Sequence, residues 1–128
     1  MPDHLFDSEV FQSYIAMIAG SLVLVYLVEI TLAFVFGARK RRDIETVFIA
    51  NSVSNPIVVT IAFLMLHFGV SYAIMNFTII VMEVCVVLCE GAVYRHFLSG
   101  GKMNPFVLSL ILNAASFGIG ILLDLLNL

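Results

Sequence analysis

An uncharged and strongly apolar stretch, residues 46–82, constrains the fold more than any other part of this sequence. As one α-helix its 37 residues would be about 55 Å long, nearly double the ~30 Å hydrocarbon core of a bilayer. The stretch must therefore fold back on itself. Residues 67–71 are the only weak point near its middle, so the sequence predicts two membrane-spanning helices joined by a turn there.

Composition extends this prediction to the whole chain. The sequence is 62% hydrophobic and 12% charged, whereas a soluble domain has about a quarter of its residues charged. Too little charge is left to cover a water-facing surface. We therefore predict an all-α membrane protein with a single domain over residues 1–128, built as an up-down bundle of four transmembrane helices. The predicted helices cover residues 13–36, 44–68, 72–97 and 105–126.

The ends of these helices are predicted from local residue types. Gly37 is expected to end the first helix, and Asp43 is a plausible cap for the second. Asn104 and Pro105 should open the fourth, with asparagine as cap and proline at the first helical position. Residues 1–12 are expected to form a polar tail, and residues 99–102 a flexible loop.

The basic residues predict the orientation in the membrane. All six lie in or within about one turn of two of the predicted loops, and the tails and the middle turn contain none. They are Arg39, Lys40, Arg41, Arg42, Arg95 and Lys102. The positive-inside rule then places the basic loops in the cytoplasm and both termini outside, in a bacterial inner membrane. A short basic run beside a span is typical of such a topology signal, so the lipid bilayer is the predicted partner and nucleic acid is not.

Carboxylates inside the predicted spans are the most informative polar residues. Glu83 and Glu90 are seven residues apart, nearly two helical turns, so both should project from one face, and Asn76 lies a further seven back. Glu29 interrupts the first helix in the same way. A carboxylate near the bilayer centre costs at least ~2.5–3.5 kcal/mol, so these groups need polar partners or water.

The other helices bring polar groups to the same depth range, from the mid-plane towards the basic loops. Pro56 lacks an N–H and should open the second helix locally by freeing the carbonyl of Ser52. We therefore predict one cavity, open towards the cytoplasm and lined by a single set of ligand-binding residues. This set is Glu29, Asn51, Ser52, Asn55, Glu83, Glu90, Asn113 and Ser116.

The chemistry of this set indicates a cationic ligand. No basic residue lies deep enough to receive an anion, so the carboxylates favour a proton, a metal cation or a small cationic solute, which the protein would bind or transport. The alternative is a structural or accessory subunit of a larger membrane complex, in which the same residues hold helices together. A homo-oligomer or a partner membrane protein is compatible with either prediction. No cofactor is predicted, and the identity of any metal is left open.

Catalysis is not expected. His67 and His96 lie near opposite membrane interfaces, where neither can easily meet a nucleophile and an orienting group. Cys85 and Cys89 are four residues apart on an apolar helix, which fits neither a CxxC redox pair nor a metal site. The two cysteines are predicted to be small apolar packing residues.

A possible internal duplication follows from the pattern V-x-V-x-L-x-E, which occurs at residues 23–29 and again at 84–90. Each glutamate is followed by N-x-x-S, beginning at Asn51 and at Asn113. The two helical hairpins would be parallel repeats related by an axis along the membrane normal. Chance is the competing explanation, because membrane-spanning helices contain few residue types and share many valines and leucines.

Several motifs together resemble those of a group of small four-helix bacterial membrane proteins without an assigned activity. They are G-x-R at 37–39, N-x-x-S-N-P at 51–56 and E-G-x-x-Y at 90–94, with Glu29, Asp43 and Glu83. The resemblance covers most of the chain and implies the fold and the membrane, but no chemistry.

Small multidrug transporters share the size and a glutamate in the first helix, yet this chain has no tryptophan and its loop charges are one-sided. The motifs of fluoride channels are not found.

Overall fold

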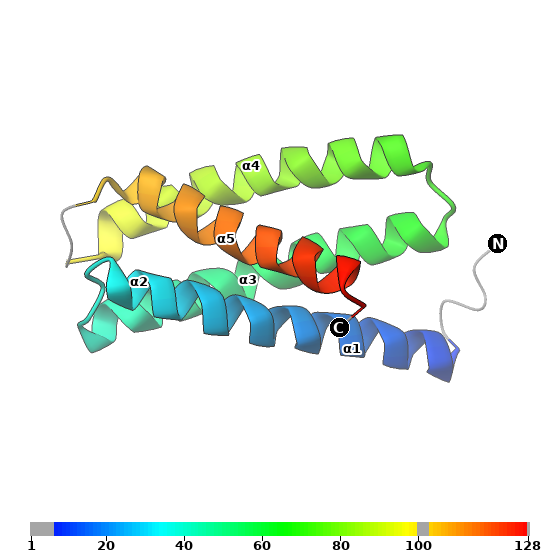
Figure 1. The fold of residues 1–128 in the computed structure, drawn as a ribbon, viewed down its shortest axis with the longest axis horizontal. Helices are drawn as coiled ribbons and strands as arrows, with labels where there is room; N and C mark the ends of the chain where they lie inside the picture. The colour runs from blue at the N-terminus through cyan, green and yellow to red at the C-terminus, as the bar shows by residue number, and fades with distance from the viewer. Residues whose placement is uncertain (1–6, 100–102, 128) are drawn as a thin grey trace.

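Four long helices lie side by side in an up-down bundle (Figure 1). The computed structural model describes residues 7–99 and 103–127. The first long helix is continuous through α1 (Ser8–Val25), η2 (Tyr26–Ile30) and α2 (Thr31–Val35). It is followed by α3 (Arg41–His67), α4 (Tyr72–Phe97) and α5 (Pro105–Leu125). All four are long and apolar enough to cross a bilayer, which confirms the predicted all-α fold of a multi-pass membrane protein.

The outer surface of the bundle is apolar along most of its length, as a lipid environment requires. Large side chains such as Leu27 and Phe77 are more than 60% exposed. Cys85 and Cys89, predicted to be small apolar packing residues, are also exposed on α4 and lie on the outer surface of the bundle. Asn76 is exposed as well, and the polar stripe on α4 therefore does not continue inward from Glu83 to this residue.

Two of the predicted helix boundaries are confirmed with their local causes. The turn between α3 and α4 lies at residues 68–71, where Gly69 has a φ of +69°. The side-chain oxygen of Asn104 accepts a hydrogen bond from the backbone N–H of Phe106 at 2.9 Å, with Pro105 at the first helical position. The first long helix ends at Val35, one residue earlier than predicted, and Gly37 follows Phe36 with a φ of +114°.

Other boundaries differ from the prediction. The first helix begins at Ser8, so residues 8–12 are helical rather than part of a polar tail. Asp43 does not cap α3, which begins at Arg41; it lies buried in the first turn of that helix. There its carboxylate accepts hydrogen bonds from the backbone N–H and the hydroxyl of Ser99, both at 3.0 Å, and so links α3 to the end of α4. Residues 1–6, 100–102 and 128, which include half of the predicted tail and most of the predicted flexible loop, lie outside the described residues.

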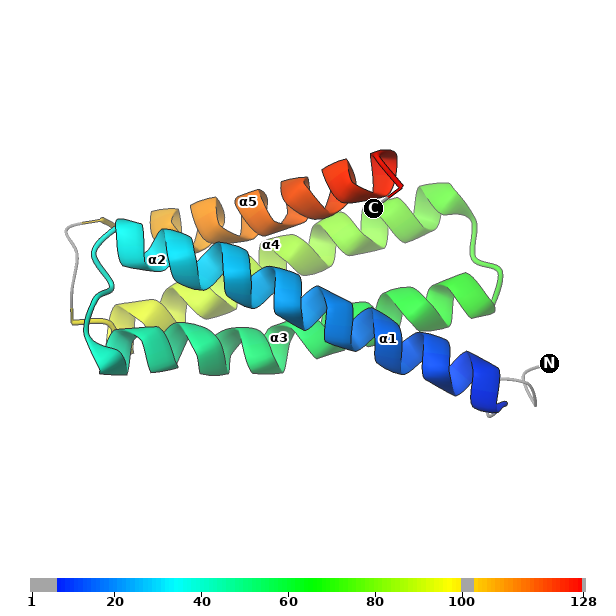
Figure 2. The same cartoon turned by 60° about the horizontal axis from the view of Figure 1, so that its bottom comes forward.

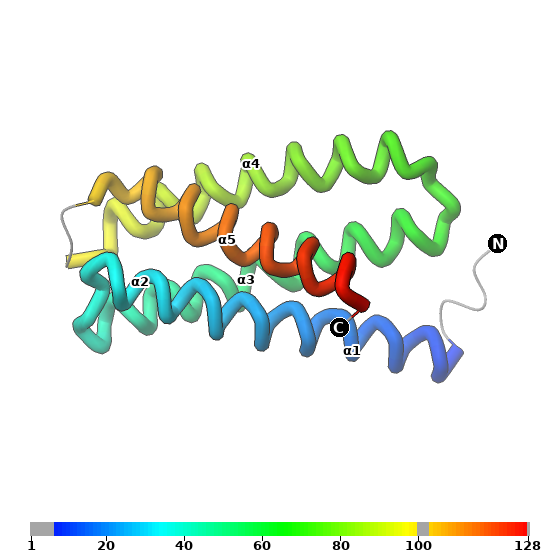
Figure 3. The backbone as a smooth tube through the Cα atoms, viewed as in Figure 1, coloured from blue at the N-terminus to red at the C-terminus, as the bar shows by residue number. Residues whose placement is uncertain are grey.

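The two ends of the bundle are packed differently. We call the end that holds Arg41 and Arg95 the basic end, and the end that holds Ser8 and Gly69 the distal end (Figures 1 and 2). A buried apolar cluster lies near the basic end, formed by Ala33, Ala38, Val47, Tyr94, Leu108 and Leu112. Towards the distal end α5 stops short of its neighbours, because it has 21 residues where the other spans have 26–28 (Figure 3). The bundle is therefore closed at the basic end and open at the distal end.

The close approach of α4 and α5 near the basic end depends on Gly91. A Cβ atom added at this buried glycine would lie 2.4 Å from a ring carbon of Phe106. We expect Gly91→Ala to displace that ring and to lower the free energy of unfolding by about 1–3 kcal/mol, the usual cost of overpacking. Thermal unfolding in detergent would measure the loss. Gly118→Ala is the matched control on α5, since no atom lies within 4 Å of its added Cβ; equal effects of the two changes would contradict this packing.

Candidate functional site

A layer of buried polar side chains crosses the bundle in the half nearer the basic end. From the helical rise per residue, the layer lies about 10–15 Å along the helices from that end. Every span contributes to it, and each member is at most 7% exposed. The members are Glu29, Asn51, Glu90, Ser109, Asn113 and Ser116. Five of the predicted site residues are thus brought to one depth by four different helices.

Glu90 is the most completely hydrogen-bonded carboxylate of this layer. The hydroxyl of Ser54 donates to Oε1 at 2.6 Å, and the side-chain N–H of Asn113 donates to Oε2 at 2.8 Å. The hydroxyl of Tyr94, one turn along the same helix, donates to Oε2 at 3.4 Å. Hydrogen bonds to an ionised group are roughly twice as strong as neutral ones, so these donors can hold Glu90 in place without a cation. The carboxylate therefore ties α3, α4 and α5 together.

Glu29 is buried but only partly hydrogen-bonded. Its Oε2 accepts a hydrogen bond from the hydroxyl of Ser116 at 3.0 Å, whereas its Oε1 is buried without a partner among the described residues. The residue lies in η2, a single stretch of π-helix within the first span. Such π-turns are rare and occur frequently at functional sites. The sequence Tyr-Leu-Val-Glu-Ile of this turn gives no signal for it, because it contains neither glycine nor proline.

The two glutamates exchange partners between the two halves of the chain. Glu29, in the first half, accepts from Ser116 in the second half, and Glu90, in the second half, accepts from Ser54 in the first. A two-fold axis along the bundle would produce this crossed pattern, which is compatible with parallel repeats. The π-turn at Glu29 has no counterpart at Glu90, where α4 is regular. Superposition of the two hairpins with one glutamate on the other stays a prediction.

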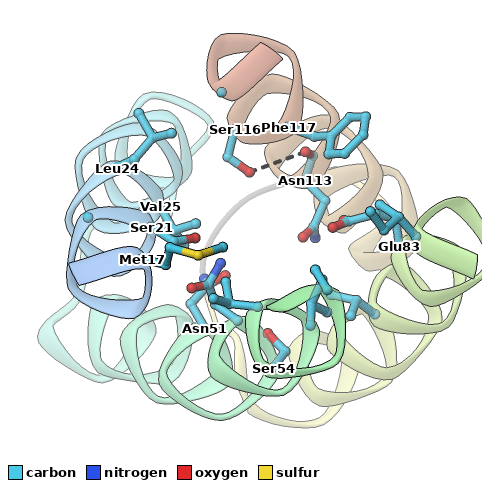
Figure 4. Close-up of a pocket in the computed structure, with 18 of the residues that line it drawn as sticks. Met17, Ser21, Leu24, Val25, Asn51, Ser54, Glu83, Asn113, Ser116 and Phe117 are labelled. Atoms are coloured by element: carbon cyan, nitrogen blue, oxygen red, sulfur yellow. Dashed lines mark hydrogen bonds between the residues drawn. The ribbon is translucent and has the colours of Figure 1, made fainter. Parts of the chain in front are cut away.

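A cavity of about 730 Å³ lies between the helices on the distal side of this layer (Figure 4). Its floor includes Glu29, Asn51, Asn113 and Ser116. The lining continues along the helices as far as Ala16, Ala62 and Asp124 near the distal end. The expectation that the cavity opens towards the basic loops is therefore wrong. The buried apolar cluster closes that side, and the short α5 leaves the other side open.

Glu83 projects from α4 into this cavity (Figure 4). It is half-buried, and within the described part of the chain its carboxylate has neither a hydrogen-bond donor nor a basic partner. The side-chain oxygen of Asn55, which also lines the cavity, is buried without a partner in the same part of the chain. Together with Oε1 of Glu29, which is also buried, three residues of the cavity lining therefore have acceptor atoms without a hydrogen-bond partner in the described part of the chain.

Two predicted site residues do not line the cavity. The hydroxyl of Ser52 lies 2.6 Å from that of Tyr26 and 2.7 Å from the carbonyl of Phe48, on another face of α3. Glu90 lies behind the cavity floor, among its hydrogen-bond donors. α3 passes through Pro56 as one helix, and the local opening expected at Ser52 stays a prediction.

The predicted set lacks three contributors to the site, namely Ser109 in the buried layer and the two donors Ser54 and Tyr94. Ser54 lines the cavity and donates to Glu90, and its place in N-x-x-S was the signal available for it. Tyr94 lies one turn after Glu90 and is fully buried, so the i, i+4 spacing could have indicated its contact with that carboxylate.

The two histidines that the structure describes do not take part in this arrangement, and no metal-ligand cluster is found among the described residues. The Nδ1 atom of His67 lies 3.1 Å from the carbonyl of Phe63, whose ring packs against the imidazole, and His96 is exposed. Across residues 7–99 and 103–127, no group of three or more His, Cys, Asp or Glu side chains could hold a metal ion. Of the described residues that line the cavity, none is Lys, Arg or His.

The hydrogen bonds of Asn113 should be measurable as stability. Asn113→Leu removes a donor from Glu90 and leaves part of that buried carboxylate unsatisfied, which we expect to cost about 1–3 kcal/mol of unfolding free energy. Thermal unfolding in detergent is the measurement. Asn76→Leu, on the exposed face of α4, is the matched control and should be neutral or stabilising. A loss at Asn76 as large as at Asn113 would show that the polar layer does not have this role.

Comparison of the chain with models of known families, with characterised protein sequences and with solved structures gives no match. The resemblance to small four-helix bacterial membrane proteins therefore remains one of sequence motifs.

Proposed function

We propose that this protein binds, and in a transport cycle carries, a proton or a small cationic solute in the cavity between its helices. The observation that carries the proposal is the buried Oε1 atom of Glu29, which has no hydrogen-bond partner among residues 7–99 and 103–127 and belongs to a residue of the cavity floor. Glu83 adds a second carboxylate on the wall. Both groups accept hydrogen bonds and attract positive charge.

The cavity suits a cation better than an anion for electrostatic reasons. A carboxylate withdrawn from water loses hydration, and a bound cation restores much of this energy through Coulomb attraction in a low dielectric. An anion would meet repulsion from Glu29 and Glu83 without a basic lining residue to offset it. The cavity volume of about 730 Å³ lies in the range typical of small-molecule sites, so a solute larger than a bare ion can be accommodated.

The remaining polar residues of the layer would hold this site in shape. Asn113 donates to Glu90, and its backbone oxygen lies 3.2 Å from the hydroxyl of Ser116, which in turn donates to Glu29 (Figure 4). Glu90 thus acts as an anchor for the floor rather than as a ligand contact. No covalent step is part of the proposed function, which is that of a binding or transport protein and not of an enzyme.

The direction of access follows from the charge bias of the loops. With the basic loops in the cytoplasm, as the positive-inside rule favours, the cavity would face the outside of the cell. Passage of a solute to the cytoplasm would then require the apolar cluster at the basic end to separate. We propose that the observed arrangement corresponds to the outward-open state of such a cycle.

A structural or accessory subunit remains the second candidate, and Glu90 is the observation that favours it. The three donors around this carboxylate make a well-satisfied interhelical network, which is the arrangement expected of residues that only hold helices together. For such a subunit, Glu83→Gln should be neutral or stabilising, because an uncharged amide is cheaper to bury.

Ligand-dependent thermal stability separates the two candidates. Butylammonium chloride should raise the melting temperature of the purified protein above that in equimolar sodium chloride, because a ligand that binds only the folded state stabilises it. Glu83→Gln should reduce this shift and Glu29→Gln should abolish it. Glu45→Gln, at an exposed position near the basic end, should leave it unchanged.

If a proton is the only ligand, butylammonium should have no effect, and the melting temperature should instead depend on pH. Glu83→Gln and Glu29→Gln should then remove this pH dependence. No ligand or pH effect, together with a neutral Glu83→Gln, would support the accessory subunit.

A further inference from the structure

The carboxylates of the cavity are arranged in two tiers along the bundle axis. Glu29 is in the floor, at the level of Ser116 and Glu90. Glu83 precedes Glu90 by seven residues on α4, and Asp124 follows Ser116 by eight residues on α5. The helical rise therefore places the upper tier, Glu83 and Asp124, about 10–12 Å nearer the distal end than the floor. Asp124 is exposed and lies at the mouth of the cavity.

The wall between the two tiers is apolar. Val86 lies between Glu83 and Glu90 on α4, and Val58 lies one turn beyond Ser54 on α3. Leu24, Val59 and Phe117 continue this apolar lining. A hydrocarbon chain placed against these side chains would be removed from water, which favours binding by about 25 cal/mol per Å² of apolar surface buried.

We propose that the cavity takes a linear aliphatic diamine in its diammonium form, an inference that rests on the proposed function. One ammonium group binds at Glu29 in the floor, the other at Glu83 and Asp124, and the methylene chain lies along the apolar wall. The acidic residues of the two tiers would not by themselves indicate a bound ligand. The independent observation is the Oε1 atom of Glu29, which has no hydrogen-bond partner among the described residues and belongs to a residue that is 1% exposed and lines the cavity. A hydrogen-bond donor bound at that depth would satisfy this acceptor.

The separation of the tiers distinguishes this ligand from simpler cations. A single metal ion holds its oxygen ligands at about 2.3–2.6 Å, so one ion cannot contact both tiers. A monoamine can neutralise either tier but not both. A diamine that is too short cannot reach from the floor to Glu83, so affinity should depend on chain length.

Binding of an amine series to the full-length protein in detergent tests the inference. The probes are butylamine, ethylenediamine, putrescine and hexamethylenediamine as chloride salts, measured by calorimetry. Putrescine or hexamethylenediamine should bind at least about ten-fold more tightly than butylamine, since one added charge-assisted hydrogen bond is sufficient for a factor of that size. Ethylenediamine should show no such gain.

Variants identify the tier responsible for the gain. The combined change Glu83→Gln and Asp124→Asn should remove the advantage of the long diamines while butylamine still binds, and Glu45→Gln should change nothing. A long-diamine advantage that survives the combined change overturns the inference. Equal affinity for butylamine and the long diamines also overturns it but leaves the proposed function intact. No amine binding at all overturns it as well, and contradicts the proposed function only if the stability of the protein is also independent of pH. Melting temperatures without ligand verify folding, and the upper-tier variant decides the outcome if Glu29→Gln does not fold.

Discussion

The need to satisfy carboxylates away from water is the constraint on which this structure depends. A buried carboxylate without a cation must find hydrogen-bond donors inside the protein or leave the bilayer interior. Glu90 finds donors on α3, α4 and α5, and Glu29 finds one on α5 through Ser116. Because these donors come from different spans, the same contacts that satisfy the acids fix the rotation and depth of every helix. The arrangement of the helices in the bundle therefore depends on the hydrogen bonds of the polar layer.

The layer also divides the bundle into two parts with different roles. On its basic side, apolar residues such as Val47 and Leu112 are fully buried and close the bundle. On its distal side the short α5 leaves a cavity whose floor is the layer itself. Residues that line this cavity have acceptor atoms without a partner among the described residues, above all the buried Oε1 of Glu29. In the proposed cation site, the hydrogen-bonded residues of the layer hold the helices together, and the residues with unpaired acceptor atoms bind the cation.

Local sequence signals predicted most of the fold, and longer-range packing explains what they missed. Hydropathy located the four spans, and Gly69 and Asn104 marked helix ends because their conformational and capping preferences are local. Asn76 was misplaced because a straight helix drifts about 20° per seven residues, and it lies fourteen residues from Glu90. The opening of the cavity was misjudged since it depends on the length of α5 and on burial near the basic end. The π-turn at Glu29 has no sequence signal that we can identify.

The central claim is that a cavity reaches from the distal end to the buried layer, and thiol accessibility tests it most directly. In a Cys85→Ala, Cys89→Ala background, single cysteines would replace Val59, which lines the cavity, and Ile57, which is 55% exposed on the lipid-facing side of α3 at nearly the same depth. A membrane-impermeant thiol reagent applied from the side of the termini should label Val59→Cys at least about ten-fold faster, because only water-exposed thiols ionise and react readily. Equal rates at the two positions, or labelling of Val59→Cys only from the side of the basic loops, would contradict the account.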